Sequence, residues 1–191
     1  LEELSLTRLA LIDLGPLKNL NGLKKLDLQQ NKISDLAPIT NLSHLTYLDL
    51  SDNQIIDLSP LNNLGELVSL SLSRNLIEDL TPLDGLNNLG NLTAYGNYIK
   101  KVKIKKGLKK LKWLDISENQ ISKVYGLIYT PLLEELNLSK NKIKDFNTFK
   151  NLLSLRNLEL RNNQLKDIEV LKTLRFLKKA DFQENNIHQL P

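Results

Sequence analysis

The side chains that most often carry out catalysis are scarce in this sequence. Its 191 residues include no cysteine and only two histidines, His44 and His188, which lie far apart along the chain. Neither histidine stands in a metal-ligand spacing, and no glycine-rich phosphate-binding loop occurs. We therefore expect a protein that is not an enzyme and that holds no metal and no cofactor.

The strongest concentration of charge lies between residues 100 and 112. Without the eight lysines of this stretch the formal net charge of +4 would be −4, so the basic character of the chain is local. Such a cluster could bind an anion, whether nucleic acid, acidic lipid or an acidic protein. No arginine or aromatic residue is interleaved with the lysines, which argues against nucleic acid, and a solvated surface is the simpler explanation. The residues of this basic patch are Lys100, Lys101, Lys103, Lys105, Lys106, Lys109, Lys110 and Lys112.

An asparagine recurs every 22 residues and indicates how the chain is organised. We divide the chain into nine units that begin at residues 1, 23, 45, 67, 89, 111, 133, 155 and 177, so that the asparagine is position 9 of every unit after the first. Position 1 is leucine in all nine units, position 4 is leucine in eight, and positions 6 and 11 are apolar throughout. This regularity predicts one repetitive domain over residues 1–191. The asparagines are Asn31, Asn53, Asn75, Asn97, Asn119, Asn141, Asn163 and Asn185.

Each unit contains the signals of one strand and one short helical turn. Apolar residues at positions 4 and 6 predict a strand with one buried face. Apolar positions 14, 17 and 20 then recur at threefold spacing, which predicts a 3₁₀ or helical turn behind the strand. One unit cannot bury its own apolar face, whereas stacked units cover one another. We therefore predict an α/β solenoid that curves around a concave parallel sheet, because strands about 4.8 Å apart are narrower than the turns behind them.

The asparagine at position 9 has a structural explanation. It follows the strand at a tight turn, where a side-chain amide can both donate to and accept from backbone groups. Replacing Asn119 is therefore expected to lower stability without affecting binding. Aromatic residues at inward positions, Phe146, Phe149 and Phe182, are expected to fill the core.

The unit at residues 89–110 departs from the pattern in its second half. Lys101, Lys103 and Lys105 alternate with Val102 and Ile104, which predicts an extended segment in place of the helical turn. The basic patch is thus expected to lie mostly on the convex or lateral surface of the array.

The motif LxxLxLxxNxI, present at residues 23–33 and repeated along the whole chain, resembles the leucine-rich repeat family. The first four units also contain Asp-Leu-x-Pro, beginning at Asp13, Asp35, Asp57 and Asp79, and this 22-residue version is similar to bacterial internalins. The Asp can cap a short helical turn, and the Pro fits its first turn. Residues 124–127, Val-Tyr-Gly-Leu, look more like regulatory subunits of eukaryotic type-1 protein phosphatases.

The resemblance implies a scaffold that binds a protein partner of unknown identity. The internalin-like units favour a bacterial surface or secreted protein. An intracellular scaffold resembling the phosphatase regulators is the alternative, with a cytoplasmic location, and anion binding through the basic patch is a third possibility. No apolar run approaches the 18 or so residues that span a bilayer. Both ends interrupt the repeat, so we expect a fragment of a longer protein, and we expect it to be monomeric.

The candidate binding residues lie on the open face of the predicted sheet. Trp113 is the only tryptophan and occupies an outward position, and large aromatic side chains on a rigid surface tend to dominate interface energies. Position 5 is mainly acidic, which fits a basic partner, a bound cation or a habit of such repeats. The candidates are Tyr47, Asp49, Ser69, Ser71, Asn91, Thr93, Tyr95, Tyr98, Trp113, Asp115, Glu135, Asn137, Glu159 and Arg161.

Overall fold

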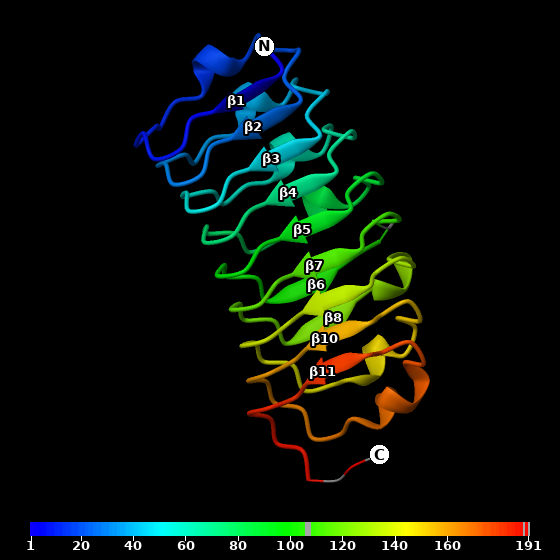
Figure 1. Ribbon diagram of the computed structural model, residues 1–191. Coiled ribbons are helices and arrows are strands. Elements are labelled where there is room, and N and C mark those ends of the chain that lie inside the picture. The colour runs from blue at the N-terminus through cyan, green and yellow to red at the C-terminus, as the bar shows by residue number, and fades with distance from the viewer. Residues whose placement is uncertain (106–107, 189, 191) are drawn as a thin grey trace.

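The computed structural model describes residues 1–105, 108–188 and 190, and its main element is a nine-stranded parallel sheet (Figure 1). Each strand occupies positions 3–5 of its unit and pairs in register with the strand of the next unit, so that Leu26 lies beside Leu48. The predicted solenoid is confirmed. The strands of the sheet are β1 (Glu3–Ser5), β2 (Lys25–Asp27), β3 (Tyr47–Asp49), β4 (Ser69–Ser71), β5 (Asn91–Thr93), β7 (Trp113–Asp115), β9 (Glu135–Asn137), β10 (Asn157–Glu159) and β11 (Lys179–Asp181).

Short 3₁₀ helices lie behind the sheet in most units (Figure 1). Where position 13 is aspartate, its carboxylate starts the helix: that of Asp35 accepts a 2.8 Å hydrogen bond from the N–H of Ala37, the first helical residue. Pro38 follows in the first turn, where its missing N–H costs nothing. The predicted capping by Asp and Pro is confirmed. The helix of the unit at residues 111–132 instead begins after Gly126. The helices are η1 (Gly15–Leu17), η2 (Ala37–Ile39), η3 (Ser59–Leu61), η4 (Thr81–Leu83), η5 (Leu127–Tyr129), η6 (Asn147–Phe149) and η7 (Glu169–Thr173).

Two units place a strand behind the main sheet. β6 (Lys101–Lys103) and β8 (Lys123–Tyr125) pair in parallel and form a separate two-stranded sheet. Position 13 of these two units is lysine, which cannot accept the N–H that an aspartate holds at the start of a 3₁₀ turn. The extended segment predicted for residues 101–105 is confirmed over β6, and β8 is its partner in the following unit.

The core is a continuous column of leucine and isoleucine side chains between the sheet and its backing. Phe146 and Phe149 are buried in it, with ring centroids 5.2 Å apart, and Phe182 packs edge-on against Phe146. The aromatic substitutions therefore fill the core, as predicted. In the described part of the chain no helix is long and apolar enough to cross a membrane.

The asparagines at position 9 join neighbouring units. Asn119 is buried, and its amide donates to the carbonyls of Ala94, Ile116 and Ser117 at 2.9–3.1 Å. Its Oδ1 accepts the N–H of Ile99 at 3.0 Å. Because Ala94 and Ile99 belong to the preceding unit, one side chain closes the turn of its own unit and holds the previous unit in place.

Candidate protein-binding surface

Trp113 lies near the middle of the open face of the main sheet. Strand β7 sits between β5 and β9, and the register places Trp113 between Asn91 and Glu135. The indole is 47% exposed, whereas the next residue, Leu114, is buried in the core. Because position 3 points away from the core, the packing of the solenoid does not require an aromatic residue there.

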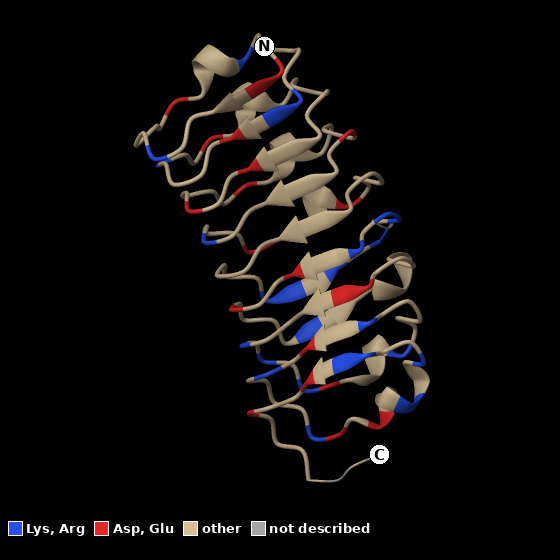
Figure 2. Cartoon of the chain, in the orientation of Figure 1, with Lys and Arg blue, Asp and Glu red and all other residues tan. Residues whose placement is uncertain are grey.

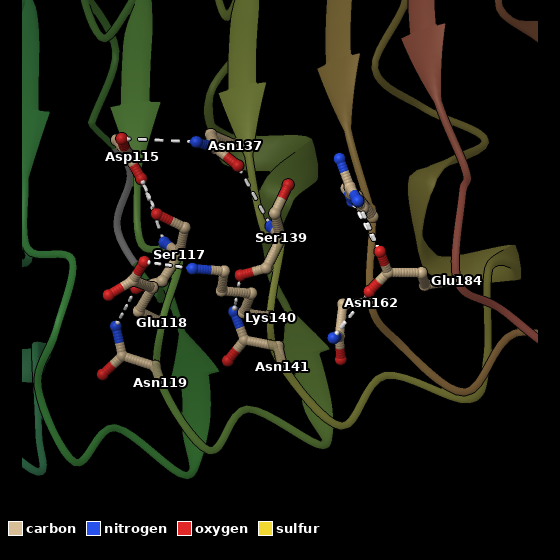
Figure 3. Close-up of polar contacts among 11 residues, drawn as sticks. Asp115, Ser117, Glu118, Asn119, Asn137, Ser139, Lys140, Asn141, Asn162 and Glu184 are labelled. Carbon is tan, nitrogen blue, oxygen red and sulfur yellow. Dashed lines mark hydrogen bonds and ion pairs between the residues drawn. The ribbon is translucent and has the colours of Figure 1, made fainter.

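Polar groups that are already paired surround Trp113. Asn137 donates a 3.4 Å hydrogen bond to Asp115 (Figure 3), and Lys179 forms a 2.8 Å ion pair with Glu159. An aromatic anchor inside a polar rim is the arrangement found at the energetic centre of many protein interfaces. The residues lining this depression of the sheet face are Trp113, Asp115, Glu135, Leu136, Asn137, Asn157, Glu159 and Lys179.

The acidic side chains at position 5 have a structural role at the strand ends. The carboxylate of Asp49 accepts the N–H of Ser51 at 2.8 Å, and Asp115 accepts the N–H of Ser117 at 3.0 Å (Figure 3). Asn137 makes the same bond to Ser139 at 3.0 Å. One oxygen of each side chain thus closes the turn after its strand. This bond gives a physical cause for the repeat's preference for Asp, without a basic partner or a cation.

A second depression lies at the amino-terminal end of the same face. It is lined by Glu3, Leu4, Ser5, Lys25, Asp27 and Tyr47. Tyr47 is half-buried, and burial raises the pKa of its phenol, with a further rise from the nearby carboxylates of Asp49 and Asp27. The depression thus combines the apolar surface of Leu4 and Tyr47 with the ion pair of Glu3 and Lys25, and it is a second mixed apolar and polar surface on the same face.

Tyr47 is expected to ionise at higher pH than a free tyrosine. Since its folded pKa lies above the unfolded value, its contribution to stability is present below the unfolded pKa and is lost as the pH rises through the folded one. The phenolate absorbance of the wild type minus that of Tyr47→Phe isolates this titration. Asp49→Asn keeps the turn acceptor but removes one charge, so it should move the pKa part of the way back. If the Tyr47 phenol titrated at the same pH in Asp49→Asn as in the wild type, the carboxylate of Asp49 would not contribute to the raised pKa.

Charged partners hold the outward residues beyond the strand ends. The guanidinium of Arg74 lies over the ring of Tyr95, 5.5 Å from its centroid, which is a cation–π contact. Arg161 forms a close ion pair with Glu184, and hydrogen bonding to Arg161 lowers the pKa of the Glu184 carboxyl. Tyr98 is exposed but follows the turn, so it lies at the edge of the face.

All fourteen predicted residues are at least partly accessible, but they do not form a single patch. Those near Trp113 come together, while Tyr47 borders the amino-terminal depression. Sequence reasoning did not select Lys25, Asn157 and Lys179, although they occupy the same outward position 3 as Trp113, which was a usable signal. Arg74 was also missed, because only the structure shows that position 8 of one unit reaches position 7 of the next.

Most of the basic patch lies elsewhere, although Lys112 immediately precedes Trp113 at the start of β7. Lys101 and Lys103 are exposed on β6, behind the main sheet, and the register adds Lys123 beside Lys101. Two of the other lysines are engaged, Lys100 with Glu78 at 2.9 Å and Lys110 with Asn88 at 2.8 Å. Lys105, Lys109 and Lys112 are exposed as well, and Lys106 lies outside the described residues. The patch on β6 therefore shares no surface with Trp113.

The chain belongs to the leucine-rich repeat family. A family model for two leucine-rich repeats matches residues 43–85, 109–151 and 131–173, and a second leucine-rich repeat model matches residues 1–55. Proteins of this family generally mediate protein–protein interactions. Comparison with curated proteins gave no match.

Solved structures that resemble the chain include two internalins of Listeria monocytogenes. Internalin C2 is 32% identical, with a TM-score of 0.87 over 94% of this chain and 80% of its own. Internalin InlF is 35% identical, with a TM-score of 0.73 over 99% of this chain, which spans only 63% of the InlF chain. A leucine-rich repeat protein of Leptospira interrogans, 24% identical over 98% of this chain and 56% of its own, shares the fold with a TM-score of 0.72. The chain is therefore an internalin-like leucine-rich repeat protein.

Proposed function

We propose that the protein is a non-enzymatic module that binds another protein on its concave sheet face, with Trp113 at the centre of the contact. The exposure of this indole carries the proposal, because the fold has no need of an aromatic residue at an outward position. Asp115 and Glu135 flank it and favour a partner that brings basic side chains around an apolar contact.

The mechanism is the rigid display of a preformed surface. Each strand is hydrogen-bonded to its neighbours, and the buried asparagines fix the turns that end the strands. A surface held in this way loses little conformational entropy on binding, so more of the contact energy appears as affinity. The similarity to internalins supports a bacterial surface or secreted protein that grips a host or cell-wall partner.

Affinity capture with matched variants tests this proposal. The wild type, Trp113→Ala and Tyr129→Ala serve as baits in parallel, and captured proteins are identified by mass spectrometry. Tyr129 is the control because its ring is 48% exposed on η5, away from the sheet face, while Trp113 is 47% exposed. The expected partner is retained by Tyr129→Ala and lost by Trp113→Ala. Because Trp113→Ala truncates a central aromatic side chain, it should raise the dissociation constant of the complex with the partner about 30-fold.

The basic patch provides the opposite control. Changing Lys101, Lys103 and Lys123 to Glu reverses the charge behind the sheet and leaves Trp113 untouched. The proposed partner should bind this variant as it binds the wild type. A partner that is lost only from the lysine variant would move the site to the two-stranded sheet and contradict the proposal.

A further inference from the structure

Three large apolar side chains are exposed along one edge of the last units. Leu132, Leu153 and Phe176 are 44%, 59% and 67% exposed, and each stands just before its strand, in the loops that enter β9, β10 and β11. These loops run along the right-hand side of Figure 1. We call Leu132, Leu153 and Phe176 the apolar edge. Two adjoining depressions share Leu153 and Phe176, so the three side chains line one continuous surface.

The earlier units show that the fold does not require apolar residues at this edge. At the same loops His44 contacts Glu66 at 3.3 Å, and Asn88 donates to the carbonyl of Gly65 at 2.8 Å. Lys110 in turn donates to Asn88 at 2.8 Å. Contacts between polar groups of successive loops therefore link the units along this edge in the first part of the array.

In the last units Leu132 and Phe176 take these places. Ser154, which lies between them, still donates to the carbonyl of Pro131 at 2.7 Å. Leu132, Leu153 and Phe176 expose apolar surface without any gain in packing, which indicates a function in binding.

Basic groups surround the apolar edge. Arg156, Lys172 and Arg175 line the two depressions, whereas Glu134 is their single carboxylate. Arg156 is paired with Glu134 at 3.3 Å and Lys172 with Glu169 at 2.7 Å. Among the described residues Arg175 is therefore the basic group of the two depressions with no ion-pair partner. Figure 2 shows the basic segments in the loops of this side. The unpaired guanidinium of Arg175 favours an occupant that carries carboxylates, and the apolar centre favours bulky apolar side chains.

We infer that the apolar edge is a second docking site, for an acidic peptide segment with bulky apolar side chains. Neighbouring strands are about 5 Å apart, so the three side chains span roughly 10 Å. This length matches about two turns of a helix or three residues of an extended chain. The segment would bury its apolar side chains against Leu153 and Phe176 and place its carboxylates near Arg156 and Arg175. This site is separate from the sheet face around Trp113, and either site can fail without the other.

Selection from random peptides tests the chemistry of the occupant. Twelve-residue random peptides displayed on phage are selected on the wild-type chain and counter-selected on a Leu153→Asp, Phe176→Asp variant, whose fold is checked by its melting curve. The enriched peptides are expected to be acidic and to contain bulky apolar residues. Synthetic copies should bind Phe176→Ala about tenfold more weakly than the wild type, as truncation of an aromatic anchor does. Arg175→Glu should also weaken them.

Controls separate this site from the other surfaces. Binding of the peptides should survive Trp113→Ala, which alters only the sheet face, and Ile56→Asp, which alters an isoleucine that is 63% exposed in another part of the array. Neutral or basic enriched peptides, or equal binding to the Phe176 variants, would overturn the inference. Sedimentation of the wild type as a dimer that Phe176→Asp dissociates would also overturn it, since a second copy would then cover the edge. Binding of the edge to phosphatidylserine vesicles in place of the peptides would assign it to a membrane.

Discussion

Replacing Gly126 by alanine is expected to destabilise the middle of the solenoid severely, by about 3 kcal/mol or more of the free energy of unfolding. Gly126 joins β8 to η5 with a φ of +80°, in the left-handed region that side chains rarely adopt. A Cβ added there would lie 1.9 Å from the carbonyl oxygen of Ile104 and 2.8 Å from its carbon. Both are backbone atoms of the preceding unit, so no side-chain rotation can relieve the clash.

Gly65→Ala is the matched control for this prediction. A Cβ at Gly65 would meet no atom within 4 Å, and its φ lies outside the left-handed region. Thermal melting followed by circular dichroism should show a large loss for Gly126→Ala and little change for Gly65→Ala. Equal melting temperatures for the two variants would mean that β8 and Ile104 do not approach each other as described.

Asn119→Ala is expected to lower the free energy of unfolding by about 2–4 kcal/mol. The substitution removes four hydrogen bonds and leaves the buried N–H of Ile99 without its acceptor, while the carbonyl of Ala94 keeps only the amide of Asn97. A buried polar group left unpaired costs about 1–3 kcal/mol. Asn119 joins the turn of its own unit to that of the preceding unit. Losing its hydrogen bonds should therefore also weaken the interface between these two units.

Urea unfolding measures this effect, with Asn151→Ala as control because Asn151 is exposed in a loop. Asn119→Ala should shift the midpoint to lower urea, and Asn151→Ala should leave it nearly unchanged. Binding to the partner at low temperature should be retained in both variants, since neither side chain lies on the sheet face. A wild-type midpoint for Asn119→Ala would refute the structural role of position 9.

Strict residue types at fixed positions made most of the fold predictable. Leucine at positions 1 and 4 predicts the strand, because in the inner units these side chains are buried in the core. Asparagine at position 9 predicts the turn after the strand, because its amide pairs with the backbone groups of that turn. The convex side was harder. Lys101 at position 13 suggested an extended segment, but its pairing with Lys123 depends on two successive units that both lack the capping aspartate. The close approach of Gly126 to Ile104 follows from that pairing.

The binding surface was predictable in direction but not in detail. The outward orientation of Trp113 follows from the two-residue period of a strand, and the structure places it on the sheet face. The contact of Arg74 with Tyr95 depends on side-chain reach between units, which spacing does not specify. The apolar edge was also missed. Leu132 and Phe176 stand at loop positions where the repeat accepts any residue type, so no pattern distinguished them from His44 or Lys110.

The most direct test of the central proposal observes Trp113 itself. Incorporation of fluorotryptophan gives a single ¹⁹F resonance, because the chain contains one tryptophan. Adding the captured, unlabelled partner should shift this resonance and abolish its sensitivity to exchange from H₂O to D₂O, as the indole passes from half-exposed to buried. A resonance that stays unchanged while the partner is bound would show that the concave face around Trp113 is not the binding site.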